Sequence, residues 1–195
     1  YFNSIIKKGN TQQIDAAKFG LAYASLKSDP KNSIKIMKAL IDTNPNKISF
    51  LITYAKALNN NKQSDLAIKT LNSHLKRNPD NYPILDTLAD IYLKNNLIQE
   101  SEKTLKTLVR IQEKNPRLWY ALAELHGLAG NIIELHRARA EYFFLTNHLE
   151  SAIKQLTLAL KKSKGKQQSI TLIQKRIDEL RWLKKNPVRP LLILS

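Results

Sequence analysis

The sequence predicts an all-α protein built as a stack of antiparallel helix pairs. Three observations support this fold class. Apolar residues recur at helical spacing along nearly the whole chain, only five of the 195 residues are glycine, and several features return every 34 residues. One helix pair has about this length, and it buries its apolar face only by stacking on neighbouring pairs. We therefore expect an α-solenoid of about five helix pairs with a C-terminal capping helix.

Composition excludes several other classes of protein. Hydrophobic residues make up 43% of the chain, which is enough to build a core. No apolar run reaches the roughly 18 to 20 residues that a membrane span needs. There is no cysteine, which excludes disulfides, cysteine-ligated zinc and thiol catalysis. The chain begins with Tyr1 and carries no signal-peptide pattern, so we interpret it as a piece of a longer protein.

The 34-residue period places the expected helix pairs. Pro45 and Pro79 are one period apart, and Ala55, Ala89 and Ala123 mark three consecutive periods. Polar breaks at 59–63, 94–96 and 129–131 predict the turns inside the pairs. We expect a repeat array over 1–166 and a basic capping helix with a tail over 167–195. The expected units lie near 15–47, 48–81, 82–115, 116–146 and 133–164, and the last two share a helix.

This pattern resembles that of tetratricopeptide repeats (TPRs). Bulky residues, a small residue and a turn glycine fall on the motif positions at Trp119, Leu122, Ala123 and Gly130. Ala67 and Pro79 fill the second-helix small position and the closing proline of the unit that starts at Ile48. Two departures are Ser101 and Leu135, which stand where the motif prefers alanine.

The resemblance implies a binding groove, because the first helices of TPR units line the concave face of an array. The outward-facing positions combine charged side chains with aromatic rings, which commonly anchor protein interfaces. An alternative is that the aromatic rings only pack against neighbouring helices. The candidate residues are Phe19, Tyr23, Lys56, Asn60, Asp86, Asp90, Lys94, Tyr120, Glu124, Arg137, Glu141 and Phe144.

Two Glu-Leu-His triplets raise the question of a metal site. Glu124 and His126 are two residues apart, as are Glu134 and His136, so on a helix the members of each pair point about 200° apart. They therefore cannot share a metal ion, and we expect the histidines to pack between helices. The H-E-x-x-H motif is also absent. The sequence predicts no catalytic residue, metal or cofactor in this chain.

Basic residues concentrate near the C-terminus. The formal net charge is +16, and residues 161–195 contribute half of it, with ten Lys/Arg against Asp178 and Glu179. Three interpretations remain open: a solvated charged helix, contact with an anionic surface, or nucleic-acid binding. Nucleic-acid binding is the weakest, because Trp182 is the only aromatic residue available for stacking.

A more specific resemblance covers nearly the whole chain. It is similar to the C-terminal TPR region of periplasmic M48-type zinc metallopeptidases, the β-barrel assembly-enhancing protease group. The features that carry it are 118–124, Gly130-Asn131, Ala138-Arg139-Ala140-Glu141-Tyr142, Asn147, Ala152-Ile153, Gln155-Leu156 and Ala159-Leu160, with Phe19-Gly20-Leu21-Ala22 near the start. The family's catalytic zinc motif has no counterpart, so zinc is expected only in a catalytic domain outside this chain.

The resemblance implies a non-catalytic domain that docks a periplasmic protease and chaperone onto a protein partner. Expected partners are the outer-membrane protein assembly machinery, unfolded outer-membrane proteins and the protease domain itself. The basic C-terminus could add contact with an anionic surface, and no specific nucleic acid is expected. Two alternatives remain: a free-standing TPR scaffold of another envelope complex, and a basic α-solenoid that binds nucleic acid.

Overall fold

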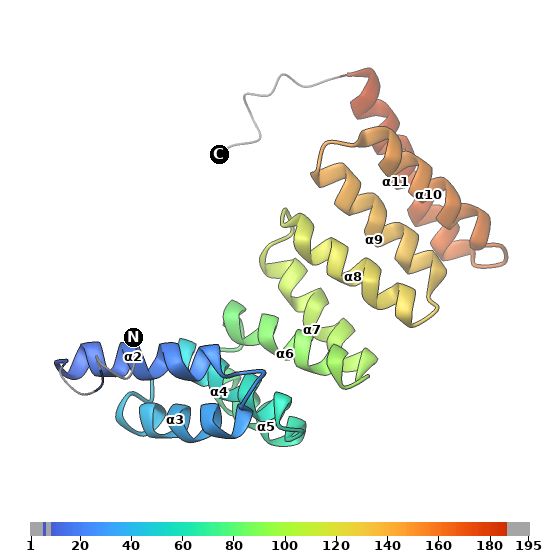
Figure 1. Cartoon of the computed structure of the whole chain (residues 1–195). Helices are drawn as coiled ribbons and strands as arrows, with labels where there is room; N and C mark the ends of the chain where they lie inside the picture. The colour runs from blue at the N-terminus through green and yellow to red at the C-terminus, as the bar shows by residue number, and fades with distance from the viewer. Residues whose placement is uncertain (1–5, 7–8, 187–195) are drawn as a thin grey trace. The chain divides into compact units, whose positions relative to one another are not determined.

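The computed structural model describes residue 6 and residues 9–186 (Figure 1). Helices joined by short turns account for nearly all of this part of the chain, and it contains no strand. Their bounds are α2 (Thr11–Ala24), α3 (Pro30–Thr43), α4 (Ile48–Asn60), α5 (Ser64–Leu75), α6 (Tyr82–Lys94), α7 (Ile98–Ile111), α8 (Pro116–Leu128), α9 (Ile132–Leu145), α10 (Leu149–Lys162) and α11 (Gln167–Lys185). The apolar tail at 187–195, part of the expected C-terminal segment, lies outside the described residues.

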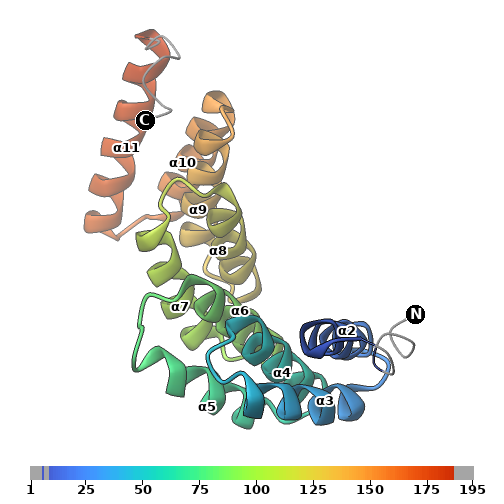
Figure 2. The same cartoon turned by 90° about the vertical axis from the view of Figure 1, so that its left-hand side faces the viewer.

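The chain divides into two compact units, residues 1–104 and residues 105–195, which we call unit 1 and unit 2. The division falls inside α7, so the third expected helix pair contributes to both units. Within unit 1, α4 contacts α2, α3, α5 and α6, as Figure 2 shows. Within unit 2, α9 packs against α8 and α10, and α10 packs against α11.

Asparagine, aspartate and proline mark the starts of several helices. The Asp29 side chain accepts a hydrogen bond from the backbone N–H of Asn32, and Pro30 is the first residue of α3. At the start of α8, Asn115 caps the helix in the same way and Pro116 follows it. Each cap satisfies a backbone donor that the helix leaves free, and proline there loses no hydrogen bond.

The 34-residue period also appears in the backbone conformation. Lys62, Asn96 and Gly130 follow α4, α6 and α8 in turn, and all have positive φ angles, of 63°, 59° and 70°. The left-handed conformation reverses the chain directly after the first helix of a pair. Asn147, after α9, has the same conformation with φ 62°. The turn after α9 therefore resembles a turn inside a pair, which is consistent with α9 acting as a first helix toward α10.

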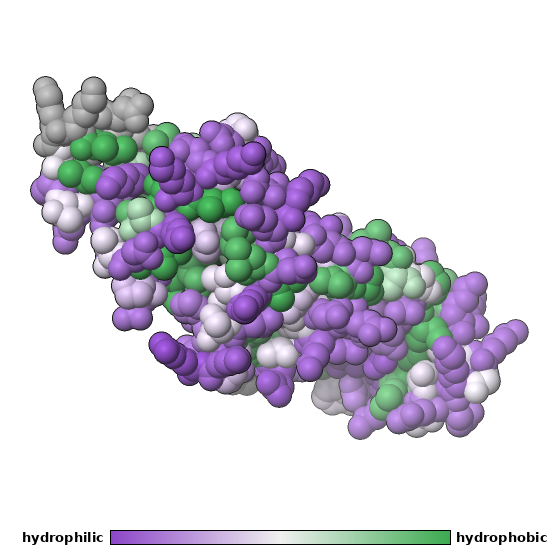
Figure 3. All heavy atoms as spheres, turned by 90° about the horizontal axis from the view of Figure 1, so that it is seen from below, coloured by the Kyte–Doolittle hydropathy of each residue, from purple (hydrophilic) through white to green (hydrophobic). Residues whose placement is uncertain are grey.

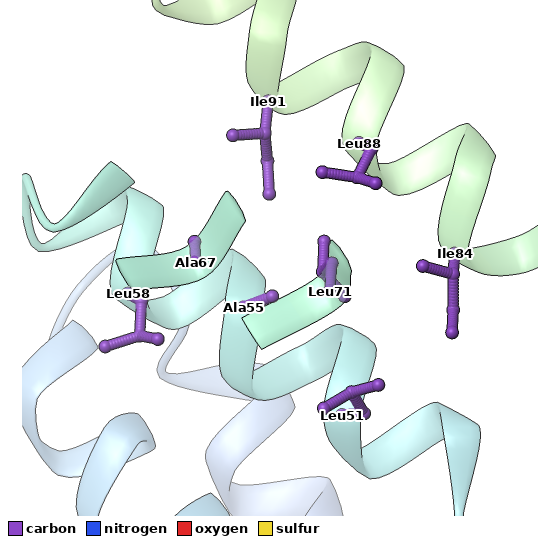
Figure 4. Packing of buried hydrophobic residues seen from close by; sticks show 8 residues of the cluster. All are labelled: Leu51, Ala55, Leu58, Ala67, Leu71, Ile84, Leu88 and Ile91. Atoms are coloured by element: carbon purple, nitrogen blue, oxygen red, sulfur yellow. The ribbon is translucent and has the colours of Figure 1, made fainter. Parts of the chain in front are cut away.

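Small residues let the helices of unit 1 approach closely. Ala55 of α4 and Ala67 of α5 are fully buried, and Leu71 and Leu88 pack around them (Figure 4). A larger side chain at either alanine would push the two helices apart. This cluster is continuous over α4, α5 and α6. The first helix of the next pair, α6, therefore covers the apolar face of the pair α4–α5.

Buried serines stand at two helix crossings, and one of them, Ser101, replaces the alanine that the motif prefers. The Ser101 hydroxyl donates a 3.0 Å hydrogen bond to the backbone oxygen of Ala89, and the Ser33 hydroxyl donates a 2.8 Å bond to that of Ala22. Both serines are fully buried. A hydroxyl that finds a carbonyl across the crossing is satisfied, so serine is accommodated where alanine is usual.

The core of unit 2 joins α9, α10 and α11. Ala140, Ala152 and Ala159 are buried between these helices, and Leu156 and Ile177 fill the space around them. The other departure from the motif, Leu135, lies opposite a glycine: a Cβ on Gly127 would be 3.8 Å from its terminal methyl carbon. Among the described residues, no helix is long and apolar enough to cross a membrane.

Candidate protein-binding surfaces

The two aromatic candidates of unit 1, Phe19 and Tyr23, differ in how far their side chains are exposed. Phe19 is half-buried, with its ring centroid 5.3 Å from that of Phe50, which is buried. Tyr23 lies one turn further along α2, 6.2 Å from Phe19, and 59% of its surface is exposed. Tyr23 is thus the accessible ring, whereas Phe19 mainly supports the contact between α2 and α4.

The polar candidates of unit 1 are partly engaged by their own chain. The Asn60 amide donates a 2.8 Å hydrogen bond to the backbone oxygen of Leu26, which fixes the turn after α2. Asp90 forms an exposed ion pair of 2.6 Å with Lys94, one turn away on α6. Lys56 and Asp86 are half-buried. Asn60 therefore has a structural role that the sequence did not indicate.

Unit 2 contains a depression that we call the central groove. It has a volume of about 510 Å³, within the range of ligand-binding clefts. Its lining comes from five helices, α7 to α11: Lys106, Val109, Trp119, Leu122, His126, Glu134, Arg137, Ala138, Glu141, Leu156, Leu172, Ile173, Lys175, Arg176 and Glu179. The groove therefore combines apolar side chains with seven acidic or basic ones.

Arg176 of α11 organises one wall of this groove. Its guanidinium donates hydrogen bonds of 2.9 and 2.6 Å to the two carboxylate oxygens of Glu141 and one of 3.1 Å to Glu179. The same group lies 4.8 Å from the ring centroid of Phe144. Burial alone would lower the pKa of Arg176, but the hydrogen bonds and charges of Glu141 and Glu179 outweigh it and raise the pKa.

A second, smaller depression lies between α8, α9 and α10, and we call it the aromatic pocket. It has a volume of about 260 Å³, and its lining includes Tyr120, Tyr142 and Phe143 together with Glu124 and Arg139. The rings of Tyr120 and Tyr142 meet edge to face at 5.5 Å. The charge of Glu124, followed by a hydrogen bond to its side chain, raises the pKa of Tyr120 above the ordinary value of 10.0.

The five candidates of unit 2 are divided between the two depressions and the core. Arg137 and Glu141 line the central groove, whereas Tyr120 and Glu124 line the aromatic pocket. Phe144 is half-buried beside the core of α9, α10 and α11, with Arg176 over its ring. The reason is that α9 packs on two sides, so neighbouring positions along it face different depressions.

Several lining residues were missed by the sequence analysis. Trp119 and Tyr142 were taken only as motif residues, and Lys175 and Arg176 only as part of the basic C-terminal segment. No local signal identifies Arg176 as the partner of Glu141, because the two are 35 residues apart.

The histidines do not gather into a metal site. His126 is buried, 3% exposed, and is one of the lining residues of the central groove. The Nδ1 atom of His136 lies 2.8 Å from the side-chain oxygen of Gln155. Within the part of the chain that the structure describes, no group of three or more His, Cys, Asp and Glu side chains could hold a metal ion.

Exposed apolar side chains are scattered over both units. Figure 3 shows a mostly hydrophilic face with short apolar stretches between charged side chains. The large hydrophobic residues with the greatest exposure are Tyr23, Leu66, Tyr120, Leu128, Ile132, Leu172 and Trp182. Single exposed residues of this kind are common, so the depressions are stronger candidates for binding than any flat patch.

Comparison with known proteins agrees with the helix-pair geometry. Residues 72–125 match the tetratricopeptide repeat family. The chain has a TPR fold. Similar solved structures include MamA from Desulfovibrio magneticus, with 13% identity and a TM-score of 0.57 over 88% of this chain and 96% of that one. Another is a thermophilic TPR protein of Thermus thermophilus, with 14% identity and a TM-score of 0.50 over 87% of this chain and 100% of that one.

These likenesses establish the fold of the chain. TPR proteins generally are non-catalytic scaffolds that bind other proteins through the extended surfaces of their stacked repeats. The fold and the depressions of unit 2 together indicate a protein-interaction scaffold.

Proposed function

We propose that this chain is a non-catalytic docking platform that binds a segment of a partner protein in the central groove. The observation that carries the proposal is the groove itself, which residues from α7 to α11 within unit 2 line. Val109, Trp119 and Leu172, which are half-buried or exposed, give it apolar side chains against which a partner side chain can pack. The Arg176–Glu141 ion pair holds α11 against α9 and so keeps the wall in place.

Charge indicates the chemistry of the partner segment. The chain carries a formal charge of +16, and Lys106, Arg137, Lys175 and Arg176 all line the groove. Arg137 and Arg176 are bound to carboxylates of their own chain, whereas Lys175 is exposed and forms no ion pair with any described residue. The best fit is a segment with one large apolar side chain flanked by carboxylates, which the field of the basic chain would attract.

Selection of displayed peptides against the purified chain tests this proposal. We expect the selected peptides to share an apolar residue next to Asp or Glu, and to bind Lys175→Glu more weakly than the unaltered chain. Lys154→Glu is the matched control, because Lys154 is exposed on α10 and lines neither depression. Basic peptides, or peptides whose binding is insensitive to Lys175→Glu, would contradict it.

A more specific proposal follows from the resemblance to M48-type metallopeptidases. The platform would belong to a periplasmic protease and chaperone and dock it onto the outer-membrane protein assembly machinery or its clients. What supports this is the sequence resemblance, whose most specific part is the block from Ala138 to Tyr142. The full reading frame tests it: an upstream H-E-x-x-H motif and a signal peptide are expected.

The alternatives make different predictions about the same reading frame and about binding. A start codon directly before Tyr1 would favour a free-standing TPR scaffold of another envelope complex. Tight binding of DNA or RNA with a sequence preference at physiological salt would favour a nucleic-acid-binding solenoid. We expect any nucleic-acid binding to be weak, independent of sequence and strongly reduced by salt.

A further inference from the structure

Lysines and exposed aliphatic residues meet at one end of unit 2, where two turns lie side by side. Ile132 at the start of α9, Lys162 at the end of α10 and Lys166 in the turn before α11 line a depression of about 330 Å³. Both turns lie at the right-hand end of unit 2 in Figure 1. The sequence separates them by about 30 residues, so this juxtaposition is visible only in the fold.

The lysines of this region are exposed and uncompensated. Lys161 and Lys162 end α10, and Lys164 and Lys166 belong to the turn that follows. All four are exposed, and none forms an ion pair with a carboxylate in the part of the chain that the structure describes. The carboxylate among the lining residues of the depression is that of Glu134, which Arg137 already binds at 2.9 Å.

Two exposed aliphatic residues flank the α8–α9 turn at the same end of unit 2. Leu128, the last residue of α8, has 72% of its surface exposed, and Ile132, the first residue of α9, has 41%. No aromatic residue lines the depression between the two turns. We call Leu128, Ile132, Lys161, Lys162, Lys164 and Lys166 the basic edge.

We propose that the basic edge binds the surface of a membrane that contains anionic lipids. Clustered lysines are attracted to anionic headgroups, each contributing to binding when it is close to the surface. Exposed aliphatic side chains can enter the boundary between headgroups and acyl chains, which adds binding that salt does not screen. A nucleic acid would use stacking partners for its bases, and the depression offers none.

Vesicle binding by the whole chain tests the inference. The probes are phosphatidylcholine vesicles with and without about 30% phosphatidylglycerol, and binding is measured by flotation. We expect binding only to the anionic vesicles. Changing Lys161, Lys162, Lys164 and Lys166 to Gln should reduce partitioning by roughly two to three orders of magnitude at low ionic strength.

A control variant separates this surface from general charge. It changes four exposed lysines of unit 1 to Gln: Lys31, Lys35, Lys38 and Lys69. It loses the same charge, so we expect it to retain most of its vesicle binding. If both variants lost binding equally, or if neither did, the inference would be wrong.

A third variant tests whether an apolar side chain of the basic edge enters the membrane surface. Leu128→Ser keeps every charge and should weaken the vesicle binding that remains at physiological salt, because it removes the side chain that enters the bilayer surface. Unchanged binding of Leu128→Ser would show that Leu128 does not insert into the bilayer surface.

A short single-stranded DNA is the competing probe. If the chain bound this DNA more tightly than the vesicles, and lost that binding when the four lysines of the basic edge are changed, nucleic acid would replace lipid as the ligand.

Discussion

Arg176 and Glu141 are 35 residues apart in the sequence and form a two-bond ion pair, with distances of 2.9 and 2.6 Å, between α11 and α9. Both side chains are mostly buried, 29% and 21% exposed, so solvent screens their interaction less than that of a surface pair. This pair connects the basic C-terminal helix to the wall of the central groove, and it leads to the first prediction.

Arg176→Met should destabilise unit 2 by about 1.5 to 3 kcal/mol, the usual range for hydrogen bonds to charged groups. The reason is that Glu141 would keep a partly buried charge without its partner. Chemical denaturation measures the change. Arg181→Met is the control, since its 3.9 Å pair with Asp178 is exposed and should contribute less than about 1 kcal/mol. Equal effects of the two substitutions would show that the buried pair has no special role.

Lys62→Gly should stabilise the fold, by up to about 1 kcal/mol, because glycine adopts a left-handed conformation without the steric cost of a Cβ atom. Lys62 has a φ of 63°, which lies in that region. Thermal unfolding measures the gain. Lys76→Gly is the control, because Lys76 is exposed, directly follows α5 as its C-cap and has a φ of −58°, so glycine should be neutral or destabilising there. A lower midpoint for Lys62→Gly would contradict the turn geometry.

Ala89→Leu should destabilise unit 1 by about 1 to 3 kcal/mol. Ala89 is 4% exposed, and its backbone oxygen accepts the hydrogen bond from Ser101 at the helix crossing, so a larger side chain would separate the two helices. Ala39→Leu is the comparison, because Ala39 is exposed on α3 and a larger side chain has room there. Equal unfolding midpoints for these two variants would mean that the 34-residue register is wrong.

Glu124→Gln should lower the pKa of Tyr120 toward its ordinary value. The Glu124 carboxylate disfavours the phenolate, so the folded chain holds the proton to higher pH than an unfolded chain does. The stability that this provides is complete below the ordinary pKa and is lost as pH rises through the raised one. NMR titration of the labelled tyrosine ring measures the shift. Glu113→Gln should leave it unchanged, and an equal shift in both variants would rule out Glu124 as the cause.

Local sequence signals predicted the repeat well. Gly130 and Asn96 adopt the left-handed conformation that their residue types favour, and the alanines at 34-residue spacing are buried at helix crossings. Lys62 occupies the equivalent turn position, but lysine has no preference for that conformation. Its geometry follows from the repeat alone, because the helices on either side fix the turn.

The division of the candidate residues between two depressions could not be predicted. The sequence placed Tyr120, Arg137 and Glu141 on one face, whereas Arg137 and Glu141 line the central groove and Tyr120 lines the aromatic pocket; the use of either depression by a partner stays a prediction. A single TPR register assigns one face to each helix, whereas α9 packs against α8 on one side and α10 on another. Arg176 lay beyond any local pattern, since tertiary packing alone brings α11 to α9.

The central claim is that a partner protein occupies the central groove, and site-specific photo-crosslinking in cells tests it most directly. A crosslinking residue would replace Lys106 or Lys175 at the groove, or Lys69 or Lys154 on exposed faces of α5 and α10. We predict that the two groove positions capture the same partner and that the two control positions do not. Capture of that partner from Lys69 and Lys154 as readily as from Lys106 and Lys175 would contradict docking in the groove.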